Sequence, residues 1–237
     1  MVGEDENLGT LAAGATVFGF TPRAAVRAEV AEQSATGSRF AVGGVRFTLP
    51  APGWHNVQNA VAAIAACQAL DVPLADMVAP LAGFQGVARR FESVGVARGI
   101  EVVDDFAHNP AKIAAAIATA RARAGRVLAV FQPHGYGPTR FLWRDFVETF
   151  ARVLGPEDRL WMLEVFYAGG TARRDFSAAA IVAEIAARGA RAEFAESRAW
   201  LVHRIAAEAR AGDLVLVMGA RDPSLTLLAQ DVLGALA

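Results

Sequence analysis

From Ile100 to the end of the chain, short apolar segments alternate with longer helix-like segments, and this alternation does most to limit the possible folds. Strands are predicted at 100–104, 126–131, 159–164, 191–194 and 213–218, with helices between them at 111–124, 141–154, 177–188, 199–210 and 223–236. Such a series predicts an α/β fold with a doubly wound, mostly parallel sheet and helices on both faces. The segments 127–131 and 214–218 are apolar throughout, which is typical of central strands buried on both faces.

The first part of the chain has a different pattern. Strands are predicted at 15–20, 26–30, 38–42 and 45–50, and the Gly43-Gly44 pair indicates a hairpin between the last two. Helices follow at 56–70 and 73–82, and Asn56 or Asn59 is a candidate cap for the first of them. Because this part has no alternating series of its own, we expect two domains, 1–96 and 97–237, with the boundary between about residues 94 and 99.

Composition excludes several classes of protein. Hydrophobic residues make up 54% of the chain, enough for a sizeable core, and no run of about 18 apolar residues is present. Charged residues make up 20% and the net charge is -1, whereas nucleic-acid-binding domains usually carry a basic excess. The single cysteine, Cys67, forms no internal disulfide and fits a reducing compartment. We therefore expect a cytoplasmic protein with neither a nucleic-acid nor a membrane partner.

Polar residues collect just after the predicted strands of the second domain. In an open parallel sheet, ligands bind beyond the carboxyl ends of the strands. The residues at these positions are Asp105, His108 and Asn109 after the first strand, Gln132, His134, Tyr136 and Arg140 after the second, Glu164, Tyr167 and Gly169 after the third, and Gly219, Arg221 and Asp222 after the last. Each has a structural alternative, such as Asn109 before Pro110 at a helix start. Together they predict a ligand site at one edge of the sheet.

Two more polar segments bear on the ligand. The sequence Gly-Trp-His-Asn-Val-Gln-Asn at 53–59 opens a predicted helix, and helix N-termini bind anions. The adjacent Arg89 and Arg90 are suited to phosphate, although in isolation a solvated linker with a local Arg–Glu pair explains them better. No Gly-x-x-x-x-Gly-Lys-Ser/Thr sequence occurs, so the chain has no recognisable phosphate loop. These features indicate a nucleotide whose triphosphate is held by another segment.

The order of these segments resembles that of the Mur ligase family. The matching motifs are Gly-x-His-Asn-x-x-Asn-x-x-Ala-Ala at 53–63, Arg-Arg-Phe-Glu at 89–92 and Asp-Asp-Phe-Ala-His-Asn-Pro at 104–110. The resemblance implies an ATP- and Mg²⁺-dependent ligase of peptidoglycan precursor synthesis, which joins an amino acid or peptide to a UDP-muramyl precursor through an acyl phosphate. The segments 131–140 and 163–169 favour members that add L-alanine to UDP-N-acetylmuramate, with members that attach a whole peptide as the alternative.

The resemblance also implies a domain assignment. It identifies 1–96 as part of the family's central domain, without its phosphate loop, and 97–237 as the Rossmann-like C-terminal domain. The further Mur domains would be supplied in cis or in trans. No Mg²⁺ ligands are identifiable in this chain. We therefore expect the chain alone to be inactive.

Roles for individual residues follow from the same resemblance. The nucleotide-binding candidates are His55, Asn56 and Asn59 at the adenine, Arg90 and Asp105 at the ribose and phosphates, and Asn109. The catalytic candidates are His108, which would line the same site, and His134 and Arg140, which would approach the acceptor amine or its carboxylate. No residue is assigned to a metal.

Departures from the family pattern leave the acceptor open. Gly135 and Pro138 replace expected arginines, and Met-Gly-Ala-Arg-Asp-Pro at 218–223 replaces a Gly-Ala-Gly-Asp ending. Arg221 is a candidate to restore the lost charge. One alternative function is a non-catalytic module that binds a nucleotide or muropeptide and docks on a complete ligase. A nicotinamide oxidoreductase is disfavoured, since no Gly-x-Gly-x-x-Gly follows Val103.

Overall fold

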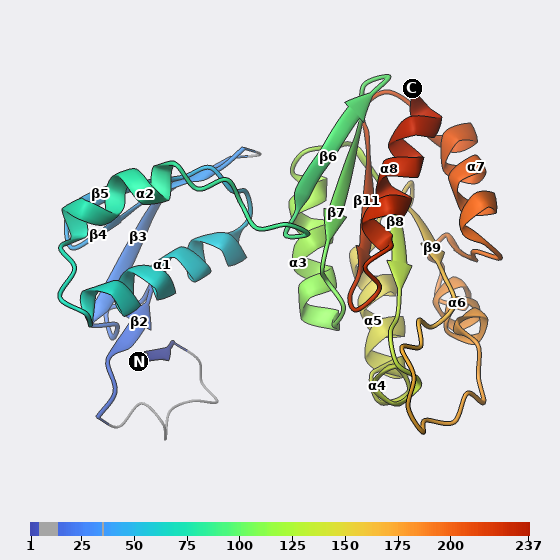
Figure 1. The fold of residues 1–237 in the computed structure, drawn as a ribbon, viewed down its shortest axis with the longest axis horizontal. Coiled ribbons are helices and arrows are strands. Elements are labelled where there is room, and N and C mark those ends of the chain that lie inside the picture. The colour runs from blue at the N-terminus through green and yellow to red at the C-terminus, as the bar shows by residue number, and fades with distance from the viewer. Residues whose placement is uncertain (5–13, 35) are drawn as a thin grey trace. The chain divides into compact units, whose positions relative to one another are not determined.

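The computed structural model describes residues 1–4, 14–34 and 36–237, which form two compact units, Met1–Gly86 and Val87–Ala237 (Figure 1). The sequence placed the division between residues 96 and 97, and the structure places it earlier. The reason is strand β6 (Glu92–Ala97), which pairs antiparallel with β7 (Ile100–Asp105) and so belongs to the second sheet.

The N-terminal unit contains a five-stranded sheet in the order β1-β2-β3-β4-β5. Its strands are β1 (Val2–Gly3), β2 (Val17–Gly19), β3 (Val26–Gln33), β4 (Ser38–Val42) and β5 (Val45–Leu49). The first three pair in parallel and the last three antiparallel. Gly43 and Gly44 turn the β4–β5 hairpin with φ of 56° and 80°, a left-handed conformation that favours glycine, so the predicted hairpin is confirmed.

Helical segments cover this sheet. They are α1 (Trp54–Gln68), the 3₁₀ turn η2 (Leu74–Met77) and α2 (Val78–Ala82). Val57, Val61 and Ile64 recur at helical spacing along α1 and pack with Phe40 and Phe47 of the hairpin strands. The spacing of these apolar residues explains why α1 forms and which side it buries.

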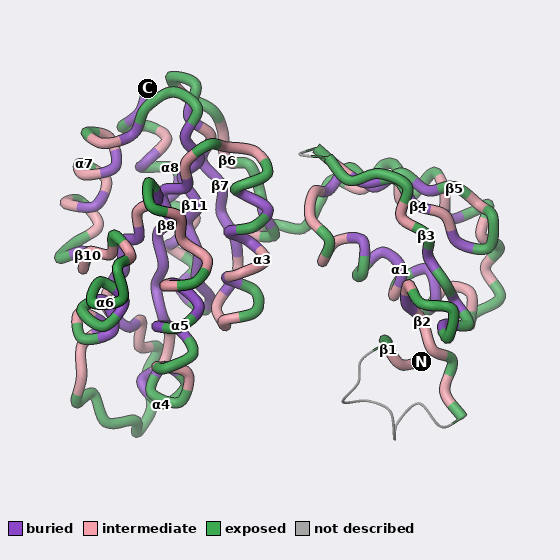
Figure 2. The backbone as a smooth tube through the Cα atoms, turned by 180° about the vertical axis from the view of Figure 1, so that it is seen from behind, coloured by how far each residue is buried: buried purple, intermediate pink, exposed green. Residues whose placement is uncertain are grey.

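The C-terminal unit is the predicted doubly wound sheet. Its strands run in the order β10-β9-β8-β11-β7-β6, and every neighbouring pair is parallel except β6 with β7. The remaining strands are β8 (Arg126–Gln132), β9 (Arg159–Met162), β10 (Ala192–Phe194) and β11 (Asp213–Gly219). Figure 2 shows the central strands as buried, which agrees with their continuous apolar sequences.

Helices cover both faces of this sheet (Figure 1). They are α3 (Pro110–Arg121), α4 (Tyr136–Phe141), α5 (Trp143–Val153), α6 (Ala178–Ala187), α7 (Arg198–Glu208) and α8 (Leu225–Leu236). Apolar residues of α3, α5 and α6 share one core cluster, and those of α7 and α8 share the other. Two cores on opposite faces are what a parallel sheet with crossover helices requires.

The short helix α4 was not predicted from the sequence. Gly135 precedes it with φ 71°, and Pro138 lies in its first turn, where its missing N–H costs nothing. The predicted helix 141–154 corresponds to α5, which Leu142 separates from α4. Across the described ranges, no helix combines the length and apolar character needed to span a bilayer.

Candidate functional site

Two predicted catalytic residues meet at the carboxyl edge of the second sheet. The ring centroids of His108 and His134 are 5.5 Å apart, in an edge-to-face arrangement. The Nδ1 atom of His108 lies 2.9 Å from the carbonyl oxygen of Phe106. Burial lowers the pKa of His134, and the neighbouring positive charges of His108 and Arg221 lower it further. His134 is therefore uncharged at neutral pH.

The backbone around His134 is fixed by an extension of the sheet. His134 forms a parallel bridge with Phe166, beyond the ends of β8 and β9. The amide of Gly135 donates to the carbonyl oxygen of Phe166 at 2.8 Å. The amide of Phe166 in turn donates to the carbonyl oxygen of Pro133 at 2.8 Å. These hydrogen bonds hold the histidine at the end of a buried strand, where it is positioned before any ligand binds.

Arg90 lies at the same edge. Its guanidinium carbon is 5.2 Å from the centroid of the Phe106 ring, and that ring contacts His108 edge-on at 5.5 Å. The arginine is exposed and, in the described part of the chain, forms no ion pair. The structure thus brings together Arg90, His108 and His134, three of the residues predicted from sequence.

Asp105 is buried and orients the segments around this group. One carboxylate oxygen accepts a hydrogen bond from the amide of Phe91 at 2.7 Å, and the other accepts one from Ala107 at 2.6 Å. These contacts tie the segment containing Arg90 to the end of β7. The predicted nucleotide-binding residue Asp105 therefore also positions its neighbours.

Beneath these residues, buried ion pairs fix the ends of the strands. The Nε atom of Arg89 is 3.2 Å from a carboxylate oxygen of Asp104, which is fully buried and also accepts a hydrogen bond from Thr226 at 2.7 Å. The same arginine donates to the carbonyl oxygens of Gly219 at 2.9 Å and Asp222 at 3.4 Å. Sequence reasoning noted Arg89 as a phosphate candidate and missed this structural role, since its partners lie far along the chain.

A second buried pair involves Asp222. Its carboxylate accepts hydrogen bonds from Arg198 at 2.6 Å and from the amide and hydroxyl of Ser224 at 2.9 and 2.5 Å. Burial alone would raise the pKa of Asp222, but these hydrogen bonds and the charge of Arg198 outweigh it and lower the pKa. Arg198 also reaches Gln132 at 3.4 Å. No sequence signal singled out Arg198, which lies at the start of α7.

Two other polar residues of this edge have structural roles. The side chain of Asn109 accepts a hydrogen bond from the amide of Lys112 at 3.0 Å and so caps α3, with Pro110 as the first helical residue. The carboxylate of Glu164 accepts hydrogen bonds at 2.5–3.0 Å from the amides of Val165 and Ala178 and from the hydroxyl of Ser177, the residue before α6. The helix-start alternative noted for Asn109 is confirmed.

Arg140 lies on α4 and contacts a different segment. Its guanidinium pairs with Asp175 and lies 5.2 Å from the ring centroid of Phe176. It also donates to the carbonyl oxygen of Arg173 at 3.5 Å. Among the contacts of the described residues, none joins Arg140 to His108 or His134. Arg140 thus has its own partners, and its predicted role at the acceptor stays a prediction.

The three adenine candidates belong to the N-terminal unit. His55, Asn56 and Asn59 lie in the first turns of α1. The expected cap by Asn56 or Asn59 is wrong, because α1 begins after Gly53, with φ 93°, and no side chain caps it. Asn56 instead donates to the carbonyl oxygen of Pro52 at 2.7 Å, and Asn59 is exposed.

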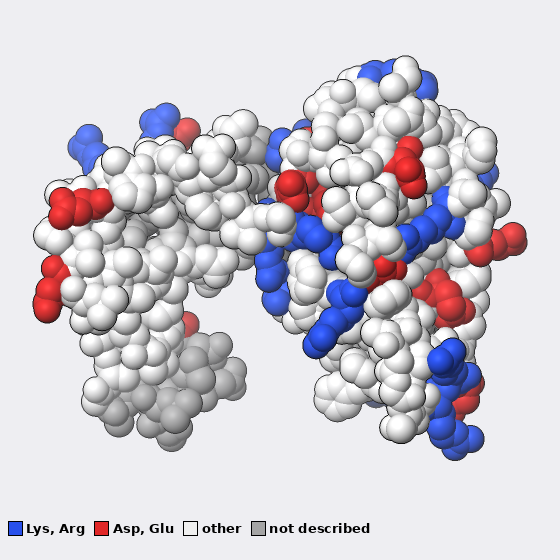
Figure 3. Space-filling view, in the orientation of Figure 1, with Lys and Arg blue, Asp and Glu red and all other residues white. Residues whose placement is uncertain are grey.

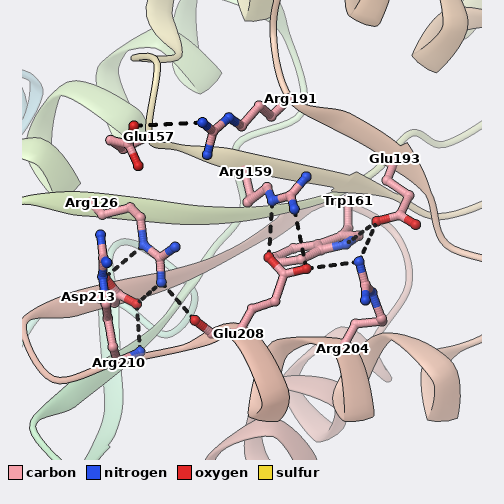
Figure 4. A network of polar contacts seen from close by, with 10 residues as sticks. All are labelled: Arg126, Glu157, Arg159, Trp161, Arg191, Glu193, Arg204, Glu208, Arg210 and Asp213. Carbon is pink, nitrogen blue, oxygen red and sulfur yellow. Dashed lines mark hydrogen bonds and ion pairs between the residues drawn. The ribbon is translucent and has the colours of Figure 1, made fainter.

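The amino side of the second sheet carries a different polar cluster (Figure 4). Four of its arginines pair with a carboxylate: Arg126 with Asp213 at 2.5 Å, Arg159 with Glu208 at 3.0 Å, Arg204 with Glu208 at 2.8 Å, and Arg191 with Glu157 at 3.7 Å. Hydrogen bonding to Asp213 raises the pKa of Arg126. Figure 3 shows charged side chains of both signs over the C-terminal unit and few on the visible face of the other unit.

Comparison with known proteins assigns this fold to a family. Residues 89–221 match the family model described as "Mur ligase, glutamate ligase domain". UDP-N-acetylmuramate–L-alanine ligase of Agrobacterium fabrum is 42% identical over 73% of this chain and 36% of its own length. The ligase of the same name from Acidothermus cellulolyticus is 39% identical over 86% of this chain and 43% of its own.

A solved structure agrees with these relatives. UDP-N-acetylmuramate-alanine ligase MurC from Thermotoga maritima has 25% sequence identity and a TM-score of 0.72, covering 92% of this chain and 47% of that one. The chain thus spans less than half the length of the curated relatives that it matches.

Proposed function

This chain belongs to the Mur ligase family, and on that premise we propose that it supplies the nucleotide- and acceptor-binding part of an ATP-dependent, amide-forming ligase of peptidoglycan precursor synthesis. The substrates would be UDP-N-acetylmuramate and L-alanine, or a related amino acid or peptide. The names of the similar ligases support this choice. The observation that carries the proposal is the group of Arg90, His108 and His134 at the carboxyl edge of the sheet.

The chemistry of amide formation explains why such a group is needed. A carboxylate attacks the terminal phosphorus of ATP, which gives an acyl phosphate and ADP. The acceptor amine then forms a bond to the carbonyl carbon, the bond from carbon to the phosphate oxygen breaks, and the amine loses a proton. Negative charge develops on the phosphoryl group and on the tetrahedral oxyanion, and positive groups stabilise both.

The residues of this edge fit those requirements. Arg90 provides a permanent positive charge, which we assign to the phosphates. Because the pKa of His134 is lowered, this histidine is uncharged at neutral pH and is able to accept the proton that the amine loses. His108 contacts its ring edge-to-face, and we assign it a role in orienting that ring. We assign Asp105 to the ribose, and we assign the N-terminal unit, with His55, Asn56 and Asn59, to the family's central domain and the adenine.

The described residues do not fit a role in holding Mg²⁺. No group of three His, Cys, Asp or Glu residues among them is arranged for a metal. The carboxylates of Asp104, Glu164 and Asp222 already accept hydrogen bonds from other parts of the unit. The sequence also contains no phosphate loop. We infer that another segment or chain grips the triphosphate and its metal, and that this chain alone does not turn over ATP.

A fusion tests the proposal. The chain is joined behind the part of the Agrobacterium fabrum ligase that precedes the matched region, and phosphate release is measured with ATP, Mg²⁺, UDP-N-acetylmuramate and L-alanine. We expect release that depends on both co-substrates in the fusion and none in the chain alone. Arg90→Gln should lower the rate by about 10²-fold or more, because a charge on the transferring group is lost.

The matched control is Arg98→Gln. Arg98 is exposed and lies in the turn between β6 and β7, away from the carboxyl edge, so its loss should leave the rate unchanged. Steady ATP hydrolysis by the chain alone would contradict the proposed dependence on a second segment. Nucleotide binding without turnover in the fusion would instead favour a non-catalytic binding module.

A further inference from the structure

The register of the second sheet places three basic residues at equivalent positions. Met218 of β11 pairs with Asp105 of β7 on one side and with Phe131 of β8 on the other. Three residues beyond this row, the three neighbouring strands continue into His108, Arg221 and His134. Arg221 thus follows the middle strand, between the strands that lead to the two histidines, and its charge acts on His134.

Among the described residues, no carboxylate forms an ion pair with His108, His134 or Arg221. Of the nearby acids, Asp104 pairs with Arg89 and Asp222 with Arg198, while the buried Asp105 accepts hydrogen bonds from the amides of Phe91 and Ala107. The surface formed by Arg221 and the two histidines therefore carries a guanidinium charge that no ion pair balances, together with polar ring nitrogen atoms. Such a surface attracts an anion.

The backbone of Arg221 is held in a strained conformation by its surroundings. Its φ of 68° lies in the left-handed region, which costs a residue with a Cβ atom about 1 kcal/mol or more. Arg89 holds the loop through the carbonyl oxygens of Gly219 and Asp222, and Arg198 holds the Asp222 side chain. The exposed Arg221 is thus the unpaired residue of a loop clamped on both sides.

Resting on the proposed function, we propose that Arg221 binds the carboxylate of the amine acceptor, with His108 and His134 beside it, and so selects acceptors that carry a free carboxylate. A guanidinium binds a planar carboxylate through two parallel hydrogen bonds, which also orients the ligand. We assign the amine of the same small molecule to the uncharged His134. Arg221 is therefore a specificity-determining residue of this site.

Ligand binding to the whole chain tests this assignment without ATP. The probes are L-alanine, L-alaninamide, which lacks the carboxylate, and inorganic phosphate. The chain has four histidines, so NMR signals of His108 and His134 can be assigned from single His→Gln variants and followed during titration. We expect L-alanine to shift both signals and to bind at least about tenfold more tightly than L-alaninamide, as one charge-assisted contact implies.

Arg221→Gln and Arg221→Gly should both remove this preference, and Arg221→Lys should restore part of it. The matched control is Arg210→Gln, which changes an exposed arginine on the amino side of the sheet and should leave the preference intact. The signal of the exposed His203 on α7 should not move with L-alanine.

Each other outcome overturns the assignment. Equal binding of L-alanine and L-alaninamide, or no response to either, shows that no carboxylate is selected. Tighter binding of phosphate than of L-alanine, lost in Arg221→Gln, reassigns Arg221 to the phosphoryl group. Because none of these measurements needs turnover, they can fail while the fusion remains an active ligase, and the two proposals are therefore tested separately.

Discussion

The two edges of the C-terminal sheet use arginine in different ways. At the amino edge Arg126, Arg159 and Arg204 are each paired with a carboxylate (Figure 4). At the carboxyl edge the partly buried Arg89 and Arg198 pair with buried carboxylates. The exposed Arg90 and Arg221 form no ion pair with any described residue. In the cluster of Figure 4 the ion pairs support the fold, whereas at the carboxyl edge Arg90 and Arg221 keep a charge that a ligand can balance.

The difference follows from the positions of the loops. In a parallel sheet the loops after the strands all lie at the carboxyl edge, so residues from distant parts of the sequence converge there. The buried pairs below fix the strand ends, and the residues above are free to differ without loss of the fold. This arrangement predicts that substitutions in the paired layer change stability and substitutions in the outer layer change binding.

The largest effect is expected for Asp213→Ala at the amino edge. Asp213 is 4% exposed and pairs with Arg126, so its removal leaves a largely buried guanidinium without a counter-charge. The free energy of unfolding should fall by about 3–5 kcal/mol. Urea denaturation at neutral pH measures it. Glu157→Ala, which breaks an exposed pair with Arg191, is the control and should cost less than about 1 kcal/mol. Equal losses would show that burial does not distinguish these pairs.

A smaller effect, with a defined pH dependence, is expected for Asp222→Asn. Loss of the charged hydrogen bonds from Arg198 and Ser224 should cost about 2 kcal/mol at neutral pH. Because the pKa of Asp222 is lowered in the folded state, its contribution is present above the ordinary value of 3.8 and is lost as the pH falls through the folded pKa.

Urea denaturation at neutral pH and again below about pH 3 checks this prediction. The difference between the wild type and Asp222→Asn should shrink at the lower pH. The exposed Asp231 on α8 provides the control, because Asp231→Asn should show neither the loss nor its pH dependence. If the difference in unfolding free energy does not change with pH, the loss of stability does not depend on the ionisation of Asp222.

In the outer layer, Arg221→Gly is expected to stabilise the protein slightly. Relief of the left-handed backbone should raise the free energy of unfolding by about 0.5–1 kcal/mol, after allowing for the greater freedom of glycine in the unfolded chain. Arg98→Gly, at another exposed left-handed position with φ 51°, should stabilise by a similar amount and leave ligand binding unchanged. Thermal and urea denaturation measure both. A clear destabilisation by Arg221→Gly would mean that this arginine belongs to the structural layer.

The smallest effect concerns the titration of His134. Its NMR titration midpoint should lie below 6.5, and Arg221→Gln and His108→Gln should each raise it by removing a positive neighbour. Since the folded state disfavours protonated His134, its contribution to stability is present above pH 6.5 and is lost as the pH falls from 6.5 through the folded pKa. If neither variant changes the titration midpoint of His134, then Arg221 and His108 do not influence its protonation.

Much of the fold was predictable because its signals are local. The strand at 38–42 was predicted with the bounds that the structure gives, and the glycine pair at 43–44 forms the expected hairpin. The helix α3 begins at Pro110, after Asn109, as that residue pair suggests. The strand β6 was missed, since its residues are largely exposed and its pairing with β7 gives no periodic signal of its own.

The candidate site was predictable in part. The rule that ligands bind beyond strand ends found His108, His134 and Arg221, because the positions of strand ends can be read from sequence. The same rule grouped Arg140 with them, but it did not show that Arg140, on α4, pairs with Asp175. Whether an arginine is paired depends on a carboxylate that can lie far along the chain, as for Arg126 and Asp213, which are 87 residues apart.

The sequence by itself determined the alternation of strands and helices from β7 onward, the absence of a phosphate loop and the family, because each depends on residues that are close together in the chain. Only the tertiary structure decided which charges are neutralised. Register places Asp105, Met218 and Phe131 in one row and so brings His108, Arg221 and His134 to one edge. The physical reason is that charge pairing acts through space over a few ångströms, which the distance along the chain does not encode.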